Sequence, residues 1–534
     1  MKRILRGGLL AGLVCVGAAG CGLSFGTDGS SDKVSGPGSL IAVESSVVTI
    51  SGLQNNSVYL CKVNLSASPK SASLTGFVNN TDVQPDPASR AARSAAPAYD
   101  DAFPLPGHPA ALAFAANPPP LPEAAPRAAR AASAPVERKV GDSHDFLVEN
   151  WFGSYTFESR TAYLRAQGAH VNIWVMGPKP GEKDLGNYTE NTKSPKTDRK
   201  ITAAQAQTLA DKFDLLYGPE TNLLGYEYGG GPGGDGGKDG DTRIQILIYD
   251  LLNEDDSPSN AAGFFWAKDF YSAGSNGSNQ AEMFYLDTDI VDGRMDYACS
   301  ALAHEFQHMI NWNEKTVKHG KSPAAWYNEM LSEMAEDALA SFINLSTTNA
   351  EHPVNTRIPR FLVSYSDIGI TDWNDLGSEA YAKAYAFGAY LMRNLGGPAL
   401  LGEILRNDAV DVDSLTKALA VKSPGMDFEQ AVTRFGEALM FSGAHKPEST
   451  FTFDVQVSST VNGITYTLPA FDIWTIRQID STNTGPKITA SLEQKGMPGY
   501  SLALQTTLSW KNRTGDLTVS ISTMPDVKMI FMAR

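Results

Sequence analysis

The sequence predicts an α+β fold in which a group of strands precedes several long helices, with short β segments at both ends of the chain. Three strand-forming runs of largely apolar residues occupy residues 169–175, 243–249 and 282–286. Helix-forming runs cover residues 203–216, 297–313, 325–342, 380–395 and 428–440. Because strands and long helices are largely segregated along the chain, we expect one α+β domain over residues 141–448. A chain of 534 residues has room for smaller domains on either side.

The first 21 residues have the pattern of an export signal. Three cations lie within the first six residues, an apolar run follows at residues 7–16, and small residues precede Cys21. These small residues resemble a bacterial lipobox, although Ala18 stands where Leu is usual. We therefore expect residues 1–21 to be a lipoprotein signal peptide, with Cys21 as the lipidated residue. A secreted protein without a lipid is the alternative.

A lipid on Cys21 places the mature chain outside the cytoplasm, tethered to a membrane of the bacterial cell envelope and facing the periplasm or the exterior. No other apolar run reaches the ~20 residues that cross a bilayer. The net charge of −15 argues against nucleic acid as a partner. Cys61 and Cys299, the two cysteines beyond the signal, form one disulfide or none. The sequence leaves the choice between inner and outer membrane and the oligomeric state open.

Two further segments separate the signal from the main domain. Residues 22–83 begin with a Gly- and Ser-rich stretch and continue with strand-forming runs at 46–50 and 57–60, which predicts a flexible tether and a small β module. Residues 84–140 consist mainly of Ala and Pro, with too little apolar bulk to build a core. We interpret them as an extended linker or, alternatively, as a pro-segment cut at an exposed arginine.

The C-terminal segment, residues 449–534, returns to short runs of alternating apolar and polar residues. Examples are residues 451–455 and 517–521. Such short, regularly spaced runs are typical of all-β domains, and they predict a C-terminal β-sandwich.

His304, Glu305 and His308 form a His-Glu-x-x-His motif inside one of the helix-forming runs. Residues four apart share a helix face, so both imidazoles point toward one ion. Zinc prefers imidazole nitrogen, and with an open coordination position it lowers the pKa of a bound water toward neutral. Glu305 is placed to take the proton from that water as general base. The small and apolar flanks favour a buried site over the alternative of a solvent-exposed helix face.

A catalytic zinc normally has three protein ligands, so the motif requires one more. A longer motif with a third His does not fit, because Glu314 and Asn311 stand where His and Gly are needed. Glu329, on the next predicted helix, provides the alternative third ligand. Glu333 shares its face and is predicted to accept the second N–H of a ligating His. The competing interpretation is that these acidic residues form a solvated helix face.

The intermediate of peptide hydrolysis also requires a hydrogen-bond donor for its oxyanion. Tyr381 and Tyr385 are four residues apart on one face of a predicted helix, and either hydroxyl is a candidate. Packing in the core is the competing role for both rings.

The motif and its surroundings resemble a known group of enzymes. Residues 304–311 and the later Trp326-Tyr327-Asn328-Glu329-x-x-Ser332-Glu333 are similar to the gluzincin metallopeptidases, the group of thermolysin. Within that group the chain most resembles the hyicolysin family of bacterial peptidases, whose strand before the zinc helix is similar to residues 279–287. Met330 departs from the pattern, because related helices commonly have a small residue after the glutamate.

The resemblance covers about residues 165–400. It implies a thermolysin-like zincin domain in which His304, His308 and Glu329 bind zinc and Glu305 is the general base.

Two groups of aspartates are weak candidates for calcium, which prefers oxygen ligands. The residues are Asp235, Asp239 and Asp241 in a glycine-rich stretch, and Asp287, Asp289 and Asp292 after the third predicted strand. Neither group has the spacing of the twelve-residue calcium loop, and a solvated loop is the simpler interpretation.

Together these features predict a zinc-dependent peptidase, and more specifically an endopeptidase, that hydrolyses proteins or peptides at the bacterial cell envelope. The alternative from another class is a surface lipoprotein adhesin or binding protein with a vestigial or structural zinc site. The retention of Glu305 favours the enzyme, because a structural zinc site needs ligands but no base.

Overall fold

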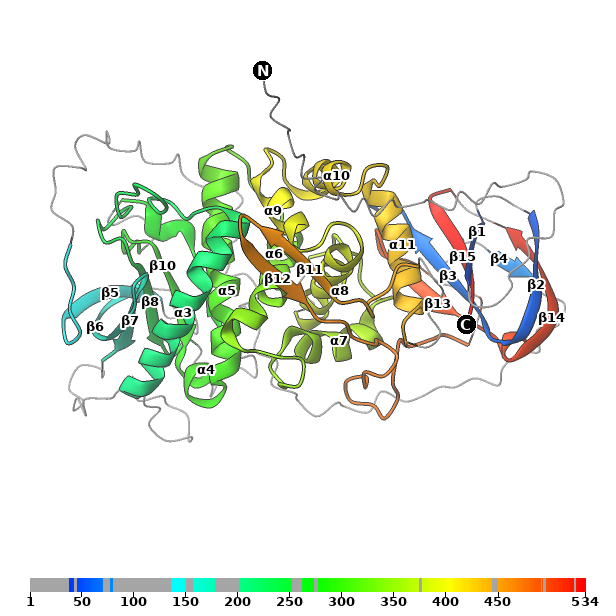
Figure 1. Cartoon of the computed structure of the whole chain (residues 1–534), viewed down its shortest axis with the longest axis horizontal. Helices are drawn as coiled ribbons and strands as arrows, with labels where there is room; N and C mark the ends of the chain where they lie inside the picture. The colour runs from blue at the N-terminus through cyan, green and yellow to red at the C-terminus, as the bar shows by residue number, and fades with distance from the viewer. Residues whose placement is uncertain are drawn as a thin grey trace, which may run out of the picture.

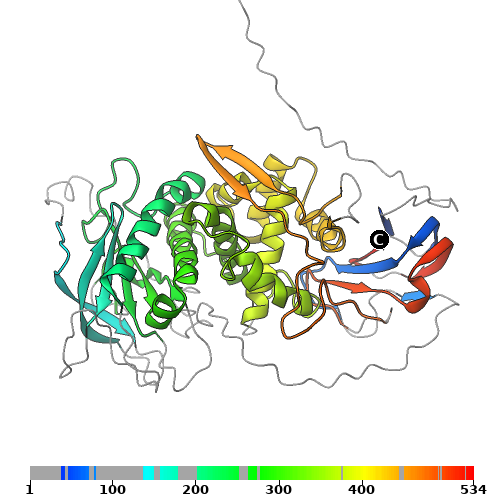
Figure 2. The same ribbon diagram turned by 60° about the horizontal axis from the view of Figure 1, so that its bottom comes forward.

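The structure is a computed structural model in which the helices lie between a six-stranded sheet at one end and two smaller sheets at the other (Figures 1 and 2). The expected signal peptide, Cys21 and residues 84–135 of the expected linker lie outside the described residues. In the part that the structure describes, no helix is long and apolar enough to cross a membrane. The described residues are 38–42, 46–70, 77–79, 136–149, 157–177, 201–251, 262–272, 277–373, 377–443, 450–490, 492, 496–522 and 525–534.

The six-stranded sheet contains all three strands that the sequence predicts. In spatial order its strands are β5 (Ser143–Glu149), β6 (Phe157–Gln167), β7 (Val171–Met176), β8 (Ile244–Tyr249), β10 (Met283–Asp287) and β9 (Gly263–Phe264). Strands β7, β8 and β10 are parallel. Strand β6 pairs antiparallel with β7, β9 with β10, and β5 with β6. Every side chain of the three parallel strands is buried. Burial on both faces explains why these strands are continuous apolar runs.

The helices form the middle of the molecule. The described α-helices are α3 (Ala203–Leu224), α4 (Thr288–Gly293), α5 (Met295–Asn311), α6 (Ala325–Leu339), α7 (Pro353–Ser364), α8 (Ser378–Asn394), α9 (Pro398–Arg406), α10 (Asp411–Lys422) and α11 (Phe428–Met440). The five helices predicted from the sequence are α3, α5, α6, α8 and α11, and all five are present. A π-helical segment, Trp312–Val317, extends α5. Helix α3 starts at a capping box made by Thr202 and Gln205, and α11 starts at another made by Asp427 and Gln430.

Helices α3 and α5 pack together against one face of the sheet. Phe213 of α3 lies 5.1 Å from Phe306 of α5 and 6.1 Å from Phe284 of β10, measured between ring centroids. All three rings are fully buried in the main hydrophobic core. This packing fixes α5, the helix that carries the His-Glu-x-x-His motif, directly beside the sheet.

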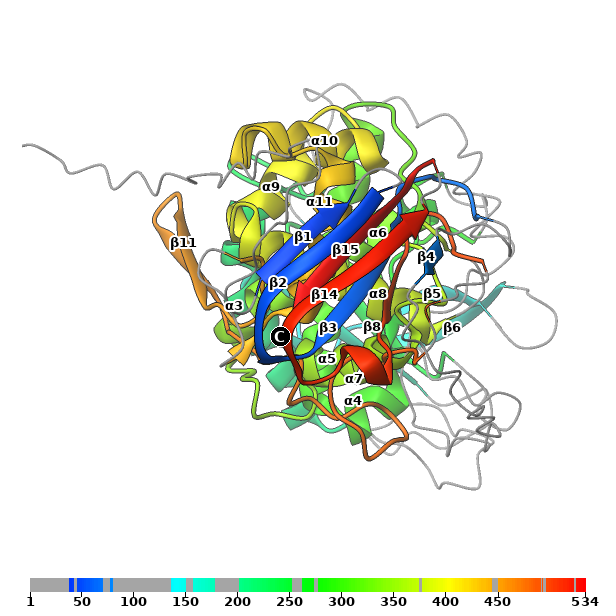
Figure 3. The ribbon, with the colours of Figure 1, turned by 90° about the vertical axis from the view of Figure 1, so that its right-hand side faces the viewer.

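The strands near the two ends of the chain form shared sheets, which corrects the expectation of separate N- and C-terminal β modules. One sheet has the order β1-β15-β3-β13 and the other the order β2-β14-β4 (Figure 3). The bounds are β1 (Gly38–Ala42), β2 (Ser46–Asn56), β3 (Val58–Asn64), β4 (Phe77–Asn79), β13 (Leu502–Gln505), β14 (Arg513–Ser522) and β15 (Val527–Ala533). Every ladder in these two sheets joins an N-terminal strand to a C-terminal one.

The two ends of the chain share these sheets because their strands bury one common apolar core. Leu53 and Leu60 from the N-terminal strands share a core with Trp510, Leu517 and Phe531 from the C-terminal strands. Isolated strands of either end would leave this apolar surface in water, and a single two-stranded hairpin is at best marginally stable alone. The predicted boundaries at residues 83, 140 and 448 remain predictions.

A hairpin of β11 (Val457–Val461) and β12 (Ile464–Leu468) packs on α6 and α9. Asn462 and Gly463 form its turn with positive φ at both positions, as a tight hairpin requires. The strand expected at residues 451–455 is absent from the structure, where these described residues form an irregular segment before the hairpin. Cys61 and Cys299 are both buried and do not form a disulfide.

Candidate metal centre

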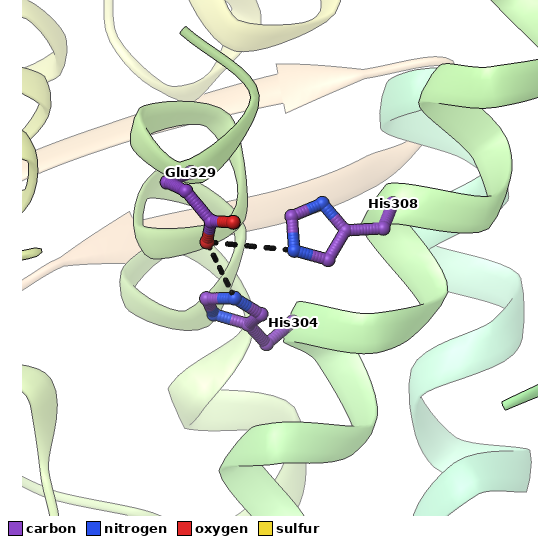
Figure 4. Close-up of side chains that lie close together, drawn as sticks. All are labelled: His304, His308 and Glu329. Carbon is purple, nitrogen blue, oxygen red and sulfur yellow. Dashed lines mark hydrogen bonds and ion pairs between the residues drawn. The ribbon is translucent and has the colours of Figure 1, made fainter. Parts of the chain in front are cut away.

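The His-Glu-x-x-His motif lies in the middle of α5, where His304, Glu305 and His308 are all buried. The two imidazole rings project from the same face of the helix, with centroids 4.8 Å apart (Figure 4). This is the arrangement that the four-residue spacing predicts.

Glu329 of α6 projects between the two histidines from the opposite side (Figure 4). Its Oε2 lies 3.1 Å from Nε2 of His304 and 3.5 Å from Nε2 of His308. Potential ligand atoms of the three residues all lie within 4.8 Å of one another. The structure therefore brings together the three side chains predicted to hold a metal, although they come from two helices.

The histidines and carboxylates of the metal centre shift one another's pKa values. Burial lowers the pKa of His304, but hydrogen bonds to Glu329 and Glu336 outweigh burial and raise it well above its usual range. Burial raises the pKa of Glu329, yet His308 and His304 lower it to about 2. The carboxylate of Glu329 is therefore ionised at neutral pH, the form in which a carboxylate binds a metal.

A zinc ion fits these residues. Two imidazole nitrogens and one carboxylate oxygen are the donor types of a catalytic zinc site with an open position. Burial raises the pKa of Glu305 to about 6 against the influence of both histidines, so this carboxyl is poised to exchange a proton near neutral pH. Its Oε2 is buried and has no hydrogen-bond partner among the described residues.

The contacts on the outer sides of the histidine rings differ from the prediction. Nδ1 of His304 lies 2.8 Å from Oε1 of Glu336, whereas the predicted partner, Glu333, binds Arg357. The prediction for Glu333 was therefore wrong. Glu333 and Glu336 lie four and seven residues after Glu329, and both spacings return to the same helix face.

His308 has a hydroxyl beside its ring instead of a carboxylate. The Ser332 Oγ lies 3.1 Å from Nδ1 and 3.3 Å from Nε2 of His308, and the hydroxyl also donates to Gln307 Oε1. It is placed to accept the Nδ1–H and so leave Nε2 for a metal. The prediction did not include Ser332 as a partner of His308, although this residue belongs to the Trp-Tyr-Asn-Glu-x-x-Ser-Glu segment that carries the family resemblance.

Of the two candidate tyrosines, the structure brings only Tyr381 to the centre. Its ring centroid lies 6.4 Å from that of His304, and Glu329 and Glu305 add to burial in raising its pKa. Tyr385 is fully buried beside Asp337 and Arg393, which form a buried ion pair with each other.

A backbone strand also approaches Glu305. A methyl group at Gly263, in the edge strand β9, would lie 3.4 Å from Cγ of Glu305 and 2.4 Å from the carbonyl oxygen of Tyr285. The contact with Tyr285 requires glycine at this position, because a side chain would collide with the β10 backbone, whereas the distance to Glu305 is an ordinary van der Waals contact.

The aspartates considered for calcium have protein partners. Asp239 lies 3.0 Å and Asp241 lies 3.3 Å from nitrogens of Arg138. Asp235 accepts the amide N–H of Gly237, and Asp287 accepts two amides at the start of α4. Among the described residues, neither set of aspartates places three ligand atoms within 4.8 Å of one another.

Comparison with known proteins agrees with this geometry. Residues 160–498, more than half of the chain, match the model of the family described as Peptidase M30. The chain is 27% identical over 329 residues to the neutral metalloprotease ShpI of Staphylococcus hyicus. The alignment covers 59% of this chain and 66% of that relative. The predicted resemblance to the hyicolysin-like peptidases is confirmed, and the chain belongs to the peptidase M30 family.

Proposed function

We propose that the protein is a zinc-dependent endopeptidase with a thermolysin-like catalytic domain. The observation that carries this proposal is the convergence of His304, His308 and Glu329 around one point. Beside them is a buried carboxylate oxygen of Glu305 that has no hydrogen-bond partner in the described part of the chain. A structural zinc site needs no such carboxylate, whereas peptide hydrolysis needs a base next to the metal.

His304, His308 and Glu329 would hold the zinc, which when bound polarises the peptide carbonyl and acidifies a water. Glu305 accepts the proton of that water and delivers it to the amine of the leaving peptide. Its pKa of about 6 suits both steps at neutral pH, because the carboxylate is ionised and yet basic enough to receive a proton. The Tyr381 hydroxyl stays protonated, since burial raises its pKa, and it donates a hydrogen bond to the oxyanion.

An extended substrate fits the edge of the six-stranded sheet. Among the described residues, strand β9 pairs only with β10 and forms the edge of the sheet, and it passes next to Glu305. A peptide that adds to this edge would form main-chain hydrogen bonds and would not need a free terminus. This supports an endopeptidase over an enzyme that trims chain ends.

The place of action is the bacterial cell envelope in this proposal. The basic start, the apolar run and the small residues before Cys21 support export followed by lipid attachment. The substrates are then proteins or peptides in the periplasm or outside the cell.

The experiment uses the chain without residues 1–21. Zinc content is measured by elemental analysis, and cleavage of casein is followed before and after removal of metal with a chelator. We expect one zinc per chain, loss of cleavage on chelation and recovery on adding zinc. A metal-free protein that cleaves nothing under any condition would contradict the proposal and favour a binding role.

A further inference from the structure

Behind the proposed zinc ligands, the structure holds a second group of close ligand atoms. Atoms of His304, Glu333 and Glu336 lie within 4.8 Å of one another, and all three residues are buried. Two adjacent buried carboxylates are strongly unfavourable without a cation beside them.

Arg357 of α7 supplies that cation. Its Nε lies 2.9 Å from both carboxylate oxygens of Glu333, and its Nη2 lies 4.0 Å from Oε1 of Glu336. Nη2 also donates to the Tyr297 hydroxyl at 3.4 Å, and the guanidinium carbon lies 6.0 Å from the centroid of the Tyr381 ring. Arg357 is only 3% exposed, so its charge is directed at these groups and not at solvent.

Glu336 keeps different nearest partners. Its Oε1 faces Nδ1 of His304 at 2.8 Å, and its Oε2 accepts the Ser300 hydroxyl at 2.5 Å. Because Arg357 binds Glu333 more closely than Glu336, the second carboxylate remains directed at the histidine. The guanidinium thus balances the charge of the pair without displacing the hydrogen bond to His304.

We propose that Arg357 is a positioning residue of the metal centre, which neutralises Glu333 and so holds Glu336 as the carboxylate that orients His304. This rests on the proposed function, since it takes His304 to be a zinc ligand. Without Arg357, Glu333 and Glu336 repel each other in a buried site, and Glu336 no longer holds the His304 ring in place.

The test compares wild type, Arg357→Gln and the double variant Arg357→Gln/Glu333→Gln. Zinc affinity is measured by competition with a chromophoric chelator, and ligand geometry by the visible spectrum of the Co²⁺-substituted protein. We expect Arg357→Gln to weaken zinc binding about 10- to 100-fold, as is typical when support of a ligand is lost. The double variant removes one carboxylate together with the cation, and we expect its affinity to return to within about threefold of wild type.

Arg393→Gln is the matched control. Arg393 forms an equally buried ion pair with Asp337, also on α6, at 2.6 Å. Its loss should destabilise the fold, as the loss of Arg357 should, but it should leave the zinc affinity of the folded protein and the Co²⁺ spectrum unchanged.

Wild-type zinc affinity in Arg357→Gln would overturn the proposal, and so would a double variant as weak as the single one. If Arg357→Gln does not fold, the double variant decides: native affinity supports the proposal and weakened affinity overturns it. A wild type that binds zinc but cleaves no protein would count against the peptidase function alone, because the affinity measurements do not depend on cleavage.

Discussion

The two histidines of the metal centre are held by partners of different charge. His304 faces the carboxylate of Glu336, whereas His308 faces the hydroxyl of Ser332. A carboxylate makes a stronger hydrogen bond to a ring N–H than a hydroxyl does, and it raises the basicity of the other ring nitrogen. The support of His304 should therefore contribute more to metal affinity than the support of His308.

Replacing Glu336 by Gln keeps the size of the side chain and removes its charge. We expect Glu336→Gln to weaken zinc affinity about 10- to 100-fold, and Ser332→Ala to weaken it by less. Chelator competition on both variants measures the difference. Equal losses would show that the charge of Glu336 has no special role.

The hydroxyls of the two tyrosines should contribute differently to catalysis. Tyr381→Phe removes the donor beside His304, and we expect kcat to fall about 100- to 1,000-fold with little change in KM. Tyr385→Phe, in the core beside Arg393, should leave kcat within about twofold, since its change lies away from the reacting groups. Steady-state kinetics on a peptide substrate distinguish the two, and equal effects would remove Tyr381 from the mechanism.

At this scale, the spacing of His304, Glu305, His308 and Glu329 in the sequence was enough to predict which side chains meet. The spacing could not show whether Glu333 or Glu336 contacts His304, because both follow Glu329 at helical spacing. Which of them does so depends on Arg357, a residue of another helix that binds Glu333. The pattern of one helix cannot show which neighbour another helix provides.

The helices and strands that the sequence predicted correctly are the long helices and the parallel strands, which have the strongest apolar patterns. Helices α7, α9 and α10 were not predicted, and each is shorter than α3, α5 or α8. Short helices contain few turns, so their periodicity is weak, and they are stabilised mainly by the packing of neighbours.

Helix α8 contains a buried lysine that makes the stability of the fold depend on pH. Lys383 donates to the Tyr365 carbonyl at 2.8 Å, and burial lowers its pKa from the usual 10.5 to about 7. Between pH 7 and 10.5 the unfolded chain binds this proton and the folded chain does not. Unfolding then takes up a proton, so the free energy of unfolding should rise with pH over this window.

Replacing Lys383 by Met removes this contribution. We expect a flatter dependence of the free energy of unfolding on pH between 7 and 9, measured by urea denaturation. Lys417→Met, on the surface and paired with Asp408, should keep the wild-type slope. An unchanged slope in Lys383→Met would show that the lysine is charged in the folded protein.

For the whole molecule, the main feature that the sequence did not reveal is the joining of its two ends. The strand-forming runs near residue 50 and residue 520 were recognisable, but their pairing spans more than 450 residues. Local patterns determine that a segment is a strand, whereas the choice of partner depends on which apolar surfaces remain to be covered.

This pairing predicts how the chain responds to a cut between residues 84 and 135, where a pro-segment or linker was expected. The N-terminal fragment should remain bound after cleavage at an introduced protease site, because β1, β2 and β3 pair with β14 and β15. Size-exclusion chromatography should show both fragments in one peak. A chain that ends at Tyr500 lacks β13, β14 and β15, the strands that pair with the N-terminal fragment, and should release it. Release from the complete chain would contradict the shared sheets.

The most direct test of the central claim is the replacement of Glu305 by Gln, with Glu314→Gln, in the π-helical segment that extends α5, as the control. We predict one bound zinc in both variants and in wild type, with casein cleavage lost in Glu305→Gln and retained in Glu314→Gln. Cleavage by Glu305→Gln at the wild-type rate would contradict the assignment of the base, and absence of zinc from all three proteins would contradict the metal centre itself.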